Sequence, residues 1–280
     1  MRARNGILSG LVAFAAGDAL GVPWEGCSRA QVAEAALVPL GERDGWPRGA
    51  TSDDTAQLLL AAEALVAAPD APERVFLERL SAELPHIRGS GPSTVAAVER
   101  FRATGALVAE SGATNGAVMR APAVGWALRD PVRRREVAVR LARTTHGAPE
   151  AQVAACVVAA LAAWSLDGDC GDAYAEARAA AALIGAPVPD LAAPAGEVGL
   201  GAVGTVGAVL ALLADHDEPG PAMCAAVRLG GDTDTVAAIA GGVLGCRLER
   251  LELAWLDEVA LPDPARLERL ADALAGVERV

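Results

Sequence analysis

The sequence predicts an all-α protein, a compact single-domain helical bundle that spans residues 1–280. Hydrophobic residues make up 52% of the chain and aromatic residues only 3%, which favours many helices packed closely through small side chains. A chain of this length and composition can bury a sizeable core. No β-branched alternation of useful length is present, so a sheet is not expected. No stretch resembles a flexible linker, and the proline-rich part, 185–197, is interpreted as a long surface loop.

The helices can be placed in order from their start and stop signals. The first is expected over 5–20, where small and apolar residues end at GVPWEG. The second is expected over 55–68, and the third over 72–84 with a proline in its first turn. HIRGSGPST, 86–94, is expected to be a loop that leads into a helix with a glycine stop at 105. Further helices are expected over 116–128, 131–144, 149–166, 171–184, 202–214, 219–229, 235–248 and 264–277.

The charge balance limits the classes of partner. The formal net charge is −12, and all 24 basic residues are arginine. A protein this acidic has no general electrostatic reason to bind nucleic acid or an anionic membrane, so neither is expected as a stable partner. An anionic substrate would need local help from helix N-termini, arginines or metal ions.

The cysteines and the apolar runs bear on location. The five cysteines are odd in number and widely spread, and no CxxC occurs, so neither a disulfide framework nor a zinc site is indicated. The N-terminal stretch briefly resembles a signal peptide, but Gly17 and Asp18 interrupt its apolar part. The longest uncharged runs, 151–166 and 198–214, fall short of a spanning helix. We expect a protein of the reducing cytoplasm, and a monomer.

Unusual polar residues gather at four junctions between loops and helices. They are GDALGVPWEG (17–26), ATSDDTAQ (50–57), GATNGAVMRAP (112–122) with TTHGAPEA (144–151), and GGDTDTVAAIAG (230–241). Two of these junctions echo each other, since Ser-Asp-Asp-Thr opens one apolar helix and Asp-Thr-Asp-Thr opens another.

Two explanations are open for the paired aspartates, which are Asp53, Asp54, Asp232 and Asp234. Helix capping is the simpler one, because Asp, Ser and Thr are preferred N-caps and acidic side chains are favoured near the positive end of a helix. Two aspartates at each of two helix starts exceed what capping requires. The other explanation is a metal site, because hard divalent cations such as Mg²⁺ and Mn²⁺ take oxygen ligands. Two such ions would balance four carboxylates.

The order of the motifs resembles that of a known family. GDALGVPWE, SDDTAQLLLAAEAL, NGAVMRAPAVG, TTHGAPEA and GGDTDTVAAIAGGVLG occur as in the ADP-ribosylglycohydrolases, and the resemblance extends from about residue 5 to about residue 258. The two aspartate boxes are highly specific as a pair. The resemblance implies a compact all-α fold, a binuclear magnesium or manganese centre, and an ADP-ribosylated protein side chain or other conjugate as substrate.

Carried over residue by residue, the resemblance implies the metal ligands Ser52, Asp53, Asp54, Asp232, Asp234 and Thr235. Ser52 stands where the family has threonine, and it keeps the hydroxyl but loses the methyl that fixes the rotamer. Glu25, which closes GDALGVPWE, matches the family's acidic residue beside the metals and would be the catalytic acid or base. The alternative for Glu25 is a surface glutamate after a turn, and Asp54 is the next candidate for the catalytic role.

The resemblance also implies the substrate contacts Gly89, Ser90, Gly91, Asn115, Gly116 and His146. The loop at 89–91 would let backbone N–H groups approach an anion, although an ordinary turn could have the same sequence. His146 would lie near the diphosphate, but a second histidine of many members is Ala148 here. The family's GYGYV-like segment appears as GLGAVGTV, 199–206, without aromatics.

The implied reaction is hydrolysis of the glycosidic bond between ADP-ribose and an acceptor. Two other functions stay open. A binuclear-metal phosphohydrolase would use the same carboxylates to cut the diphosphate and release AMP. A non-catalytic ADP-ribose-binding protein is the third, and the retention of oxygen ligands at all the metal positions argues against it.

Overall fold

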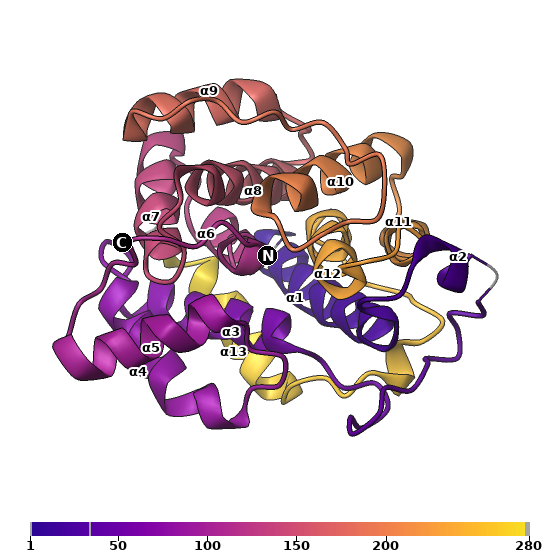
Figure 1. Ribbon diagram of the computed structural model, residues 1–280. Helices are drawn as coiled ribbons and strands as arrows, with labels where there is room; N and C mark the ends of the chain where they lie inside the picture. The colour runs from indigo at the N-terminus through magenta and orange to yellow at the C-terminus, as the bar shows by residue number, and fades with distance from the viewer. Residues whose placement is uncertain (1, 34, 278–280) are drawn as a thin grey trace.

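The protein is built from helices, as the computed structural model of residues 2–33 and 35–277 shows (Figure 1). Within these residues the β contacts amount to two isolated bridges, and the all-α prediction is confirmed. The α-helices are α1 (Arg2–Gly21), α2 (Arg29–Val32), α3 (Asp53–Ala67), α4 (Glu73–Glu83), α5 (Pro92–Thr104), α6 (Pro122–Ala127), α7 (Pro131–Arg143), α8 (Pro149–Asp167), α9 (Ala173–Ile184), α10 (Ala202–Asp215), α11 (Pro219–Val227), α12 (Thr233–Gly245) and α13 (Pro264–Leu274). The short 3₁₀ helices are η1 (Val22–Trp24), η2 (Leu84–His86), η3 (Asn115–Ala117) and η4 (Leu256–Glu258).

Helices α1 and α12 form a closely packed central pair (Figure 1). Glycines on α1 permit the close approach. A Cβ at Gly17 would lie 2.3 Å from the carbonyl oxygen of Ala237, and a Cβ at Gly21 would lie 2.3 Å from the Cα of Asp234. The C-terminal end of α1 therefore lies against the first turn of α12, where the polar residues of both helices meet.

Helix α8 is the centre of the other half of the molecule, and α6, α7, α9 and α10 pack around it. Nearly every residue of α8 is buried, which explains why its side chains are apolar on all faces of the helix. By length and composition alone, α8 and the segment Arg2–Trp24 could each cross a membrane, but 83% of each apolar stretch is buried inside the protein. That burial is typical of core helices.

The structure departs from the sequence prediction at 116–128, where one continuous helix was expected. The chain instead forms η3, a turn and the short helix α6. Pro122 has no N–H to donate and suits only the first turn of a helix, so α6 begins there. The guanidinium of Arg120 also donates hydrogen bonds to the carbonyl oxygens of Gly116 and Leu141. In a continuous helix the Gly116 carbonyl oxygen would instead accept from a backbone N–H.

Helix α2 was not predicted, because four residues are too few to show a period. It is held by a capping box, in which the Ser28 side chain accepts from the Gln31 N–H and the Gln31 side chain accepts from the Ser28 N–H. Helix α5 begins at Pro92, two residues before the expected end of the preceding loop.

Candidate active site

The residues that the sequence singled out all line one pocket of about 470 Å³. They are Glu25, Ser52, Asp53, Asp54, Gly89, Ser90, Gly91, Asn115, Gly116, His146, Asp232, Asp234 and Thr235. The volume suits a small-molecule site. Two larger hollows, of about 530 and 660 Å³, share only Ser52 with this set, so chemistry rather than size distinguishes the pocket. The residues come from segments far apart in the chain, and the fold brings them together, while the role of each remains a prediction.

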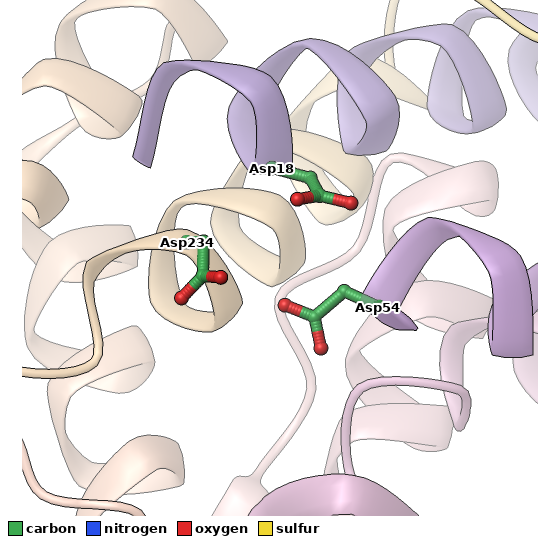
Figure 2. Close-up of side chains that lie close together, drawn as sticks. All are labelled: Asp18, Asp54 and Asp234. Atoms are coloured by element: carbon green, nitrogen blue, oxygen red, sulfur yellow. The ribbon is translucent and has the colours of Figure 1, made fainter. Parts of the chain in front are cut away.

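Three helices meet at the acidic wall of the pocket (Figure 2). Asp18 lies near the end of α1, Asp54 in the first turn of α3 and Asp234 in the first turn of α12. These three are buried, and carboxylate oxygens of all three lie within 4.8 Å of one another. Glu25, Asp232 and Asp234 form a second group within the same distance. Because Asp234 belongs to both groups, it could be shared between two adjacent cations.

Helix capping does not account for Asp54 or Asp232. Ser52 is the N-cap of α3, and its Oγ accepts a hydrogen bond from the Asp54 N–H at 3.1 Å. Asp232 stands at the N-cap position of α12 but makes no side-chain capping bond. The carboxylates of Asp54 and Asp232 are therefore not needed to start these helices.

Asp18 is a member of the cluster that the sequence reasoning did not assign. Its side chain is fully buried, and its carboxylate accepts hydrogen bonds from the Ser52 N–H at 3.0 and 3.1 Å. It also accepts from the Thr55 N–H at 3.1 Å and from the Thr55 hydroxyl at 2.5 Å. Asp18 thus fixes the first turn of α3 and, with it, the position of Asp54. The available signal was an aspartate within an otherwise apolar helical stretch.

Burial raises the pKa of every aspartate in the cluster, because an apolar surrounding disfavours the charged form. The pKa of Asp18 and that of Asp232 rise to about 6, and that of Asp53 rises to about 7. Burial raises the pKa of Asp54 and of Asp234 well above the usual range, and repulsion from neighbouring aspartates adds to it. Without cations, the cluster therefore retains protons near neutral pH.

The donor set suits hard divalent cations. Carboxylates and the hydroxyls of Ser52 and Thr235 face the same pocket, and these are the oxygen ligands that Mg²⁺ and Mn²⁺ prefer. The Oδ2 atom of Asp54 is buried and, in the described part of the chain, has no hydrogen-bond partner. A buried polar atom left in this state requires a partner, and a cation would supply it.

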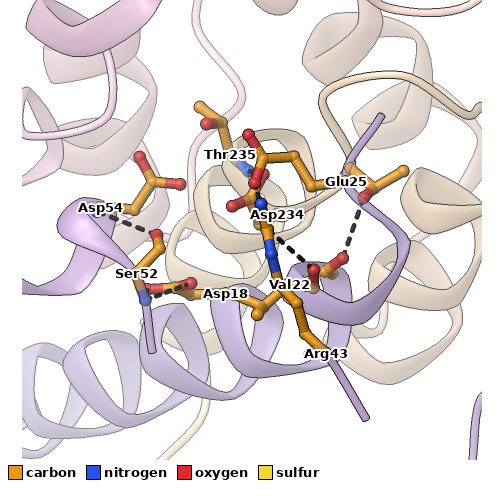
Figure 3. Close-up of polar contacts among 10 residues, drawn as sticks. Asp18, Val22, Glu25, Arg43, Ser52, Asp54, Asp234 and Thr235 are labelled. Carbon is orange, nitrogen blue, oxygen red and sulfur yellow. Dashed lines mark hydrogen bonds and ion pairs between the residues drawn. The ribbon is translucent and has the colours of Figure 1, made fainter. Parts of the chain in front are cut away.

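Glu25 lies on the loop that follows η1, at the edge of the acidic wall (Figure 3). Its half-buried carboxylate forms an ion pair with Arg43, whose Nη1 also donates to the Val22 carbonyl oxygen at 3.1 Å. Glu25 thus follows a turn, as the alternative of a surface glutamate has it, but its side chain is half-buried, paired with Arg43 and close to Asp232 and Asp234. Its catalytic role stays a prediction.

Backbone hydrogen bonds tie the loops around the pocket to one another. The Gly26 N–H donates to the Gly231 carbonyl oxygen, and the Gly231 N–H donates to the Cys27 carbonyl oxygen, each at 2.8 Å. The Asp232 N–H donates to the Val198 carbonyl oxygen at 2.7 Å. At Gly231 φ is +80°, and a Cβ there would lie 2.1 Å from the Val198 carbonyl oxygen. Glycine is thus required where these loops cross.

Asn115 and His146 also line the pocket. The Asn115 amide donates to Asp232 and to the Thr205 hydroxyl, the latter at 3.0 Å. The His146 ring is buried, with Nδ1 2.7 Å from the Thr145 hydroxyl and Nε2 2.8 Å from the Thr114 hydroxyl. Burial, helped by nearby Arg120, lowers the pKa of His146 to about 3, so the ring is neutral. Both ring nitrogens are engaged by threonines, which fix the orientation of the ring at the wall of the pocket.

A family model described as ADP-ribosylglycohydrolase matches residues 1–280. The chain belongs to the ADP-ribosylglycohydrolase family. Among solved structures, the chain is similar to an "ADP-ribosylglycohydrolase-related protein complex", with 30% sequence identity, a TM-score of 0.81, and coverage of 99% of this chain and 99% of that chain. Among curated proteins no match is found.

Membership of the ADP-ribosylglycohydrolase family confirms the resemblance drawn from the motifs. The family consists of hydrolases that act on ADP-ribosylated substrates and generally depend on divalent metal, and this chain has the acidic clusters that such metals require.

The remaining walls of the pocket are the glycine-rich loop at 89–91 and the segment before α10. Gly91 is the N-cap of α5, so the loop at 89–91 lies at the positive end of a helix. The hydroxyl of Ser90 is buried and, among the described residues, has no hydrogen-bond partner. Leu200 lines the pocket with a side chain that is 57% exposed, so an apolar aliphatic group stands in the segment where the family pattern has aromatics.

Proposed function

We propose that this protein is a divalent-metal-dependent hydrolase that cleaves the glycosidic bond between ADP-ribose and an acceptor and releases ADP-ribose. One observation carries the proposal: Asp234, which the two carboxylate groups share, lines the same pocket as the glycine-rich loop at the N-terminus of α5, together with Glu25, Asp54 and Asp232. A cation centre and an anion-binding loop within one pocket suit a substrate that joins a ribose to a diphosphate.

The proposed cofactor is a pair of Mg²⁺ or Mn²⁺ ions. The proposed ligands are Ser52, Asp53, Asp54, Asp232, Asp234 and Thr235. Bound there, such ions would act as Lewis acids that orient ribose hydroxyls and lower the pKa of a water molecule. Zinc suits the site less well, because the pocket's histidine has both ring nitrogens engaged by threonines.

Cleavage of the glycosidic bond would also require a carboxylate of the pocket to transfer a proton. Positive charge develops at the anomeric carbon in an oxocarbenium-like transition state, as in glycoside hydrolysis generally. Glu25 would carry a proton, either away from water or to the leaving group, because its carboxylate is the half-exposed one at the edge of the cluster. Asp54, fixed by the hydrogen bonds that Asp18 accepts from its helix, is the second candidate for this role.

The opposite part of the pocket would hold the rest of ADP-ribose. Backbone N–H groups at 89–91, with the positive end of α5, would meet the diphosphate. Asn115 and Gly116 would lie beside the ribose, since the Asn115 amide donates to Asp232. His146 would contribute by orienting the Thr114 hydroxyl, to which its Nε2 is hydrogen-bonded.

A substrate panel tests the proposal. ADP-ribosylated arginine, serine and nucleic-acid conjugates are incubated with the protein in Mn²⁺, in Mg²⁺ and in excess chelator, and products are separated by chromatography. We expect free ADP-ribose from at least one substrate, with metal only. Release of AMP instead would indicate a phosphohydrolase, and full activity in chelator would rule out the metal-dependent mechanism.

A further inference from the structure

Arg43 brings a positive charge directly to the edge of the acidic wall. Its Nη1 donates to the Glu25 carboxylate and to the Val22 carbonyl oxygen (Figure 3). The guanidinium carbon lies 4.8 Å from the centre of the Trp46 ring, which is a cation–π distance. Carboxylate, carbonyl and ring together hold the guanidinium in one place.

The carboxylate that Arg43 holds also lies beside the position proposed for a second cation. Glu25 belongs to the group with Asp232 and Asp234, whose carboxylate oxygens lie within 4.8 Å of one another. The other group, Asp18 with Asp54 and Asp234, does not include Glu25. The two cation positions therefore differ: Arg43 acts directly on one of them and not on the other.

We propose that Arg43 is a resident counter-ion of the second cation position, which weakens binding there until the incoming cation displaces it from Glu25. This inference rests on the proposed binuclear centre. The guanidinium and a divalent cation repel each other at this short range, and the single charge of Glu25, which lies beside both, cannot offset both of them. The first position fills unhindered, and the second fills only at higher cation concentration.

A purely structural role for Arg43 makes the opposite prediction. If the guanidinium only holds Glu25 in the right place, removing it would loosen the carboxylate and weaken the second cation. The sign of the change in affinity therefore separates the two roles.

The test measures Mn²⁺ binding to chelator-treated full-length protein, by calorimetry and by the paramagnetic resonance of free Mn²⁺. The variant is Arg43→Gln, and Arg43→Met serves as a second one that keeps the apolar stem against Trp46. Arg48→Gln is the matched control, because Arg48 lies on the same loop but pairs with Glu258 at 2.8 Å. Thermal unfolding of each metal-free protein accompanies the titrations.

We expect two classes of site in the wild type. Removing the charge of Arg43 should tighten the weaker site by about tenfold and leave the tighter site unchanged, a moderate effect because the pair is partly exposed. The same variants should be less stable than wild type without metal, since a counter-ion of the cluster is lost. Arg48→Gln should behave as wild type in both measurements.

Two other results would overturn the inference, and they can be told apart. Two sites in the wild type, with the weaker one unchanged or weakened in both Arg43 variants, would assign Arg43 a structural role and leave the binuclear centre standing. Fewer than two Mn²⁺ ions bound by the wild type would refute the binuclear centre itself, and the role of Arg43 with it.

Discussion

The proposed proton transfer by Glu25 can be tested with a single substitution. Glu25→Gln keeps the size of the side chain and removes its capacity to carry a proton. The rate should fall by about 10²–10⁴-fold if that proton transfer is part of the reaction, while ADP-ribose still binds. Turnover and ADP-ribose affinity are measured at saturating Mn²⁺, so that altered metal occupancy does not contribute. Glu42→Gln, an exposed change on a nearby loop, is the control. Normal turnover in Glu25→Gln would move the role to Asp54.

At the scale of residues, the sequence was enough to single out the carboxylates that line the pocket but not the contacts that support them. The paired aspartates were found because two carboxylates at a helix start exceed what capping uses. Asp18 was not found, because its partners are backbone N–H groups more than thirty residues away, which carry no signal in the sequence. Arg43 was not found either, since an arginine in a polar loop is ordinary until the fold places it on Glu25.

The packing of α1 on α12 is the element-scale feature that holds Asp18 beside Asp234. Gly21→Ala should disturb it, because the added Cβ would lie 2.3 Å from the Cα of Asp234 and 2.5 Å from its backbone nitrogen. Such overpacking typically costs about 1–3 kcal/mol. The displaced Asp234 should also reduce the stabilisation that Mn²⁺ provides. Denaturant unfolding with and without Mn²⁺ measures both effects.

The matched control for this change is Gly204→Ala in α10, where a Cβ would meet no atom within 4 Å. Alanine there should add about 0.5–1 kcal/mol through helix propensity. The response to Mn²⁺ should be that of the wild type. If Gly21→Ala behaved like this control, the close contact between the helices would not be what positions Asp234.

At the scale of elements, the helices with apolar sequences and clear end signals were predictable within a few residues. The break near 116–128 was missed although Pro122, at which α6 begins, is visible in the sequence. The contribution of Arg120 was not visible, because its guanidinium bonds to the Gly116 carbonyl oxygen and to that of Leu141 on a distant segment. The contact between loops at Gly231 could not be predicted from the sequence either. Its glycine was visible, but the Val198 carbonyl oxygen that requires it is supplied by a distant loop.

The charge of the whole cluster should make the metal-free protein less stable as pH rises from about 5 to about 8. Unfolded aspartates titrate near 3.9, whereas the folded pKa values are about 6 for Asp18 and for Asp232 and about 7 for Asp53. In this window the folded state holds more protons than the unfolded state, so stability falls with rising pH. His146 acts in the opposite sense, because its folded pKa of about 3 favours folding as pH rises through its unfolded pKa. Because His146 is a single group and several carboxyls act in the other sense, the net effect is a fall in stability with rising pH.

Saturating Mn²⁺ should reverse this dependence, since cation binding requires the ionised carboxylates. Urea unfolding at several pH values, in chelator and in Mn²⁺, provides the comparison. Parallel curves under the two conditions would mean that the cations do not bind at the carboxylate cluster.

Asp234 decides whether the molecule as a whole is organised around metal, because it belongs to both carboxylate groups. Asp234→Asn should leave the fold intact, since the Oδ1 atom that accepts from the Thr235 N–H at 3.0 Å is retained. Without metal, a neutral amide replaces a carboxyl whose ionisation burial and repulsion from neighbouring aspartates already oppose, so the melting temperature should be unchanged or higher. With Mn²⁺, the stabilisation should shrink because a shared ligand has lost its charge, and turnover should be abolished. Asp44→Asn, an exposed change on the loop that carries Arg43, should keep both the Mn²⁺ response and the activity of the wild type. A full Mn²⁺-induced shift in Asp234→Asn would remove Asp234 from the ligand set and leave it as a buried residue at the start of α12.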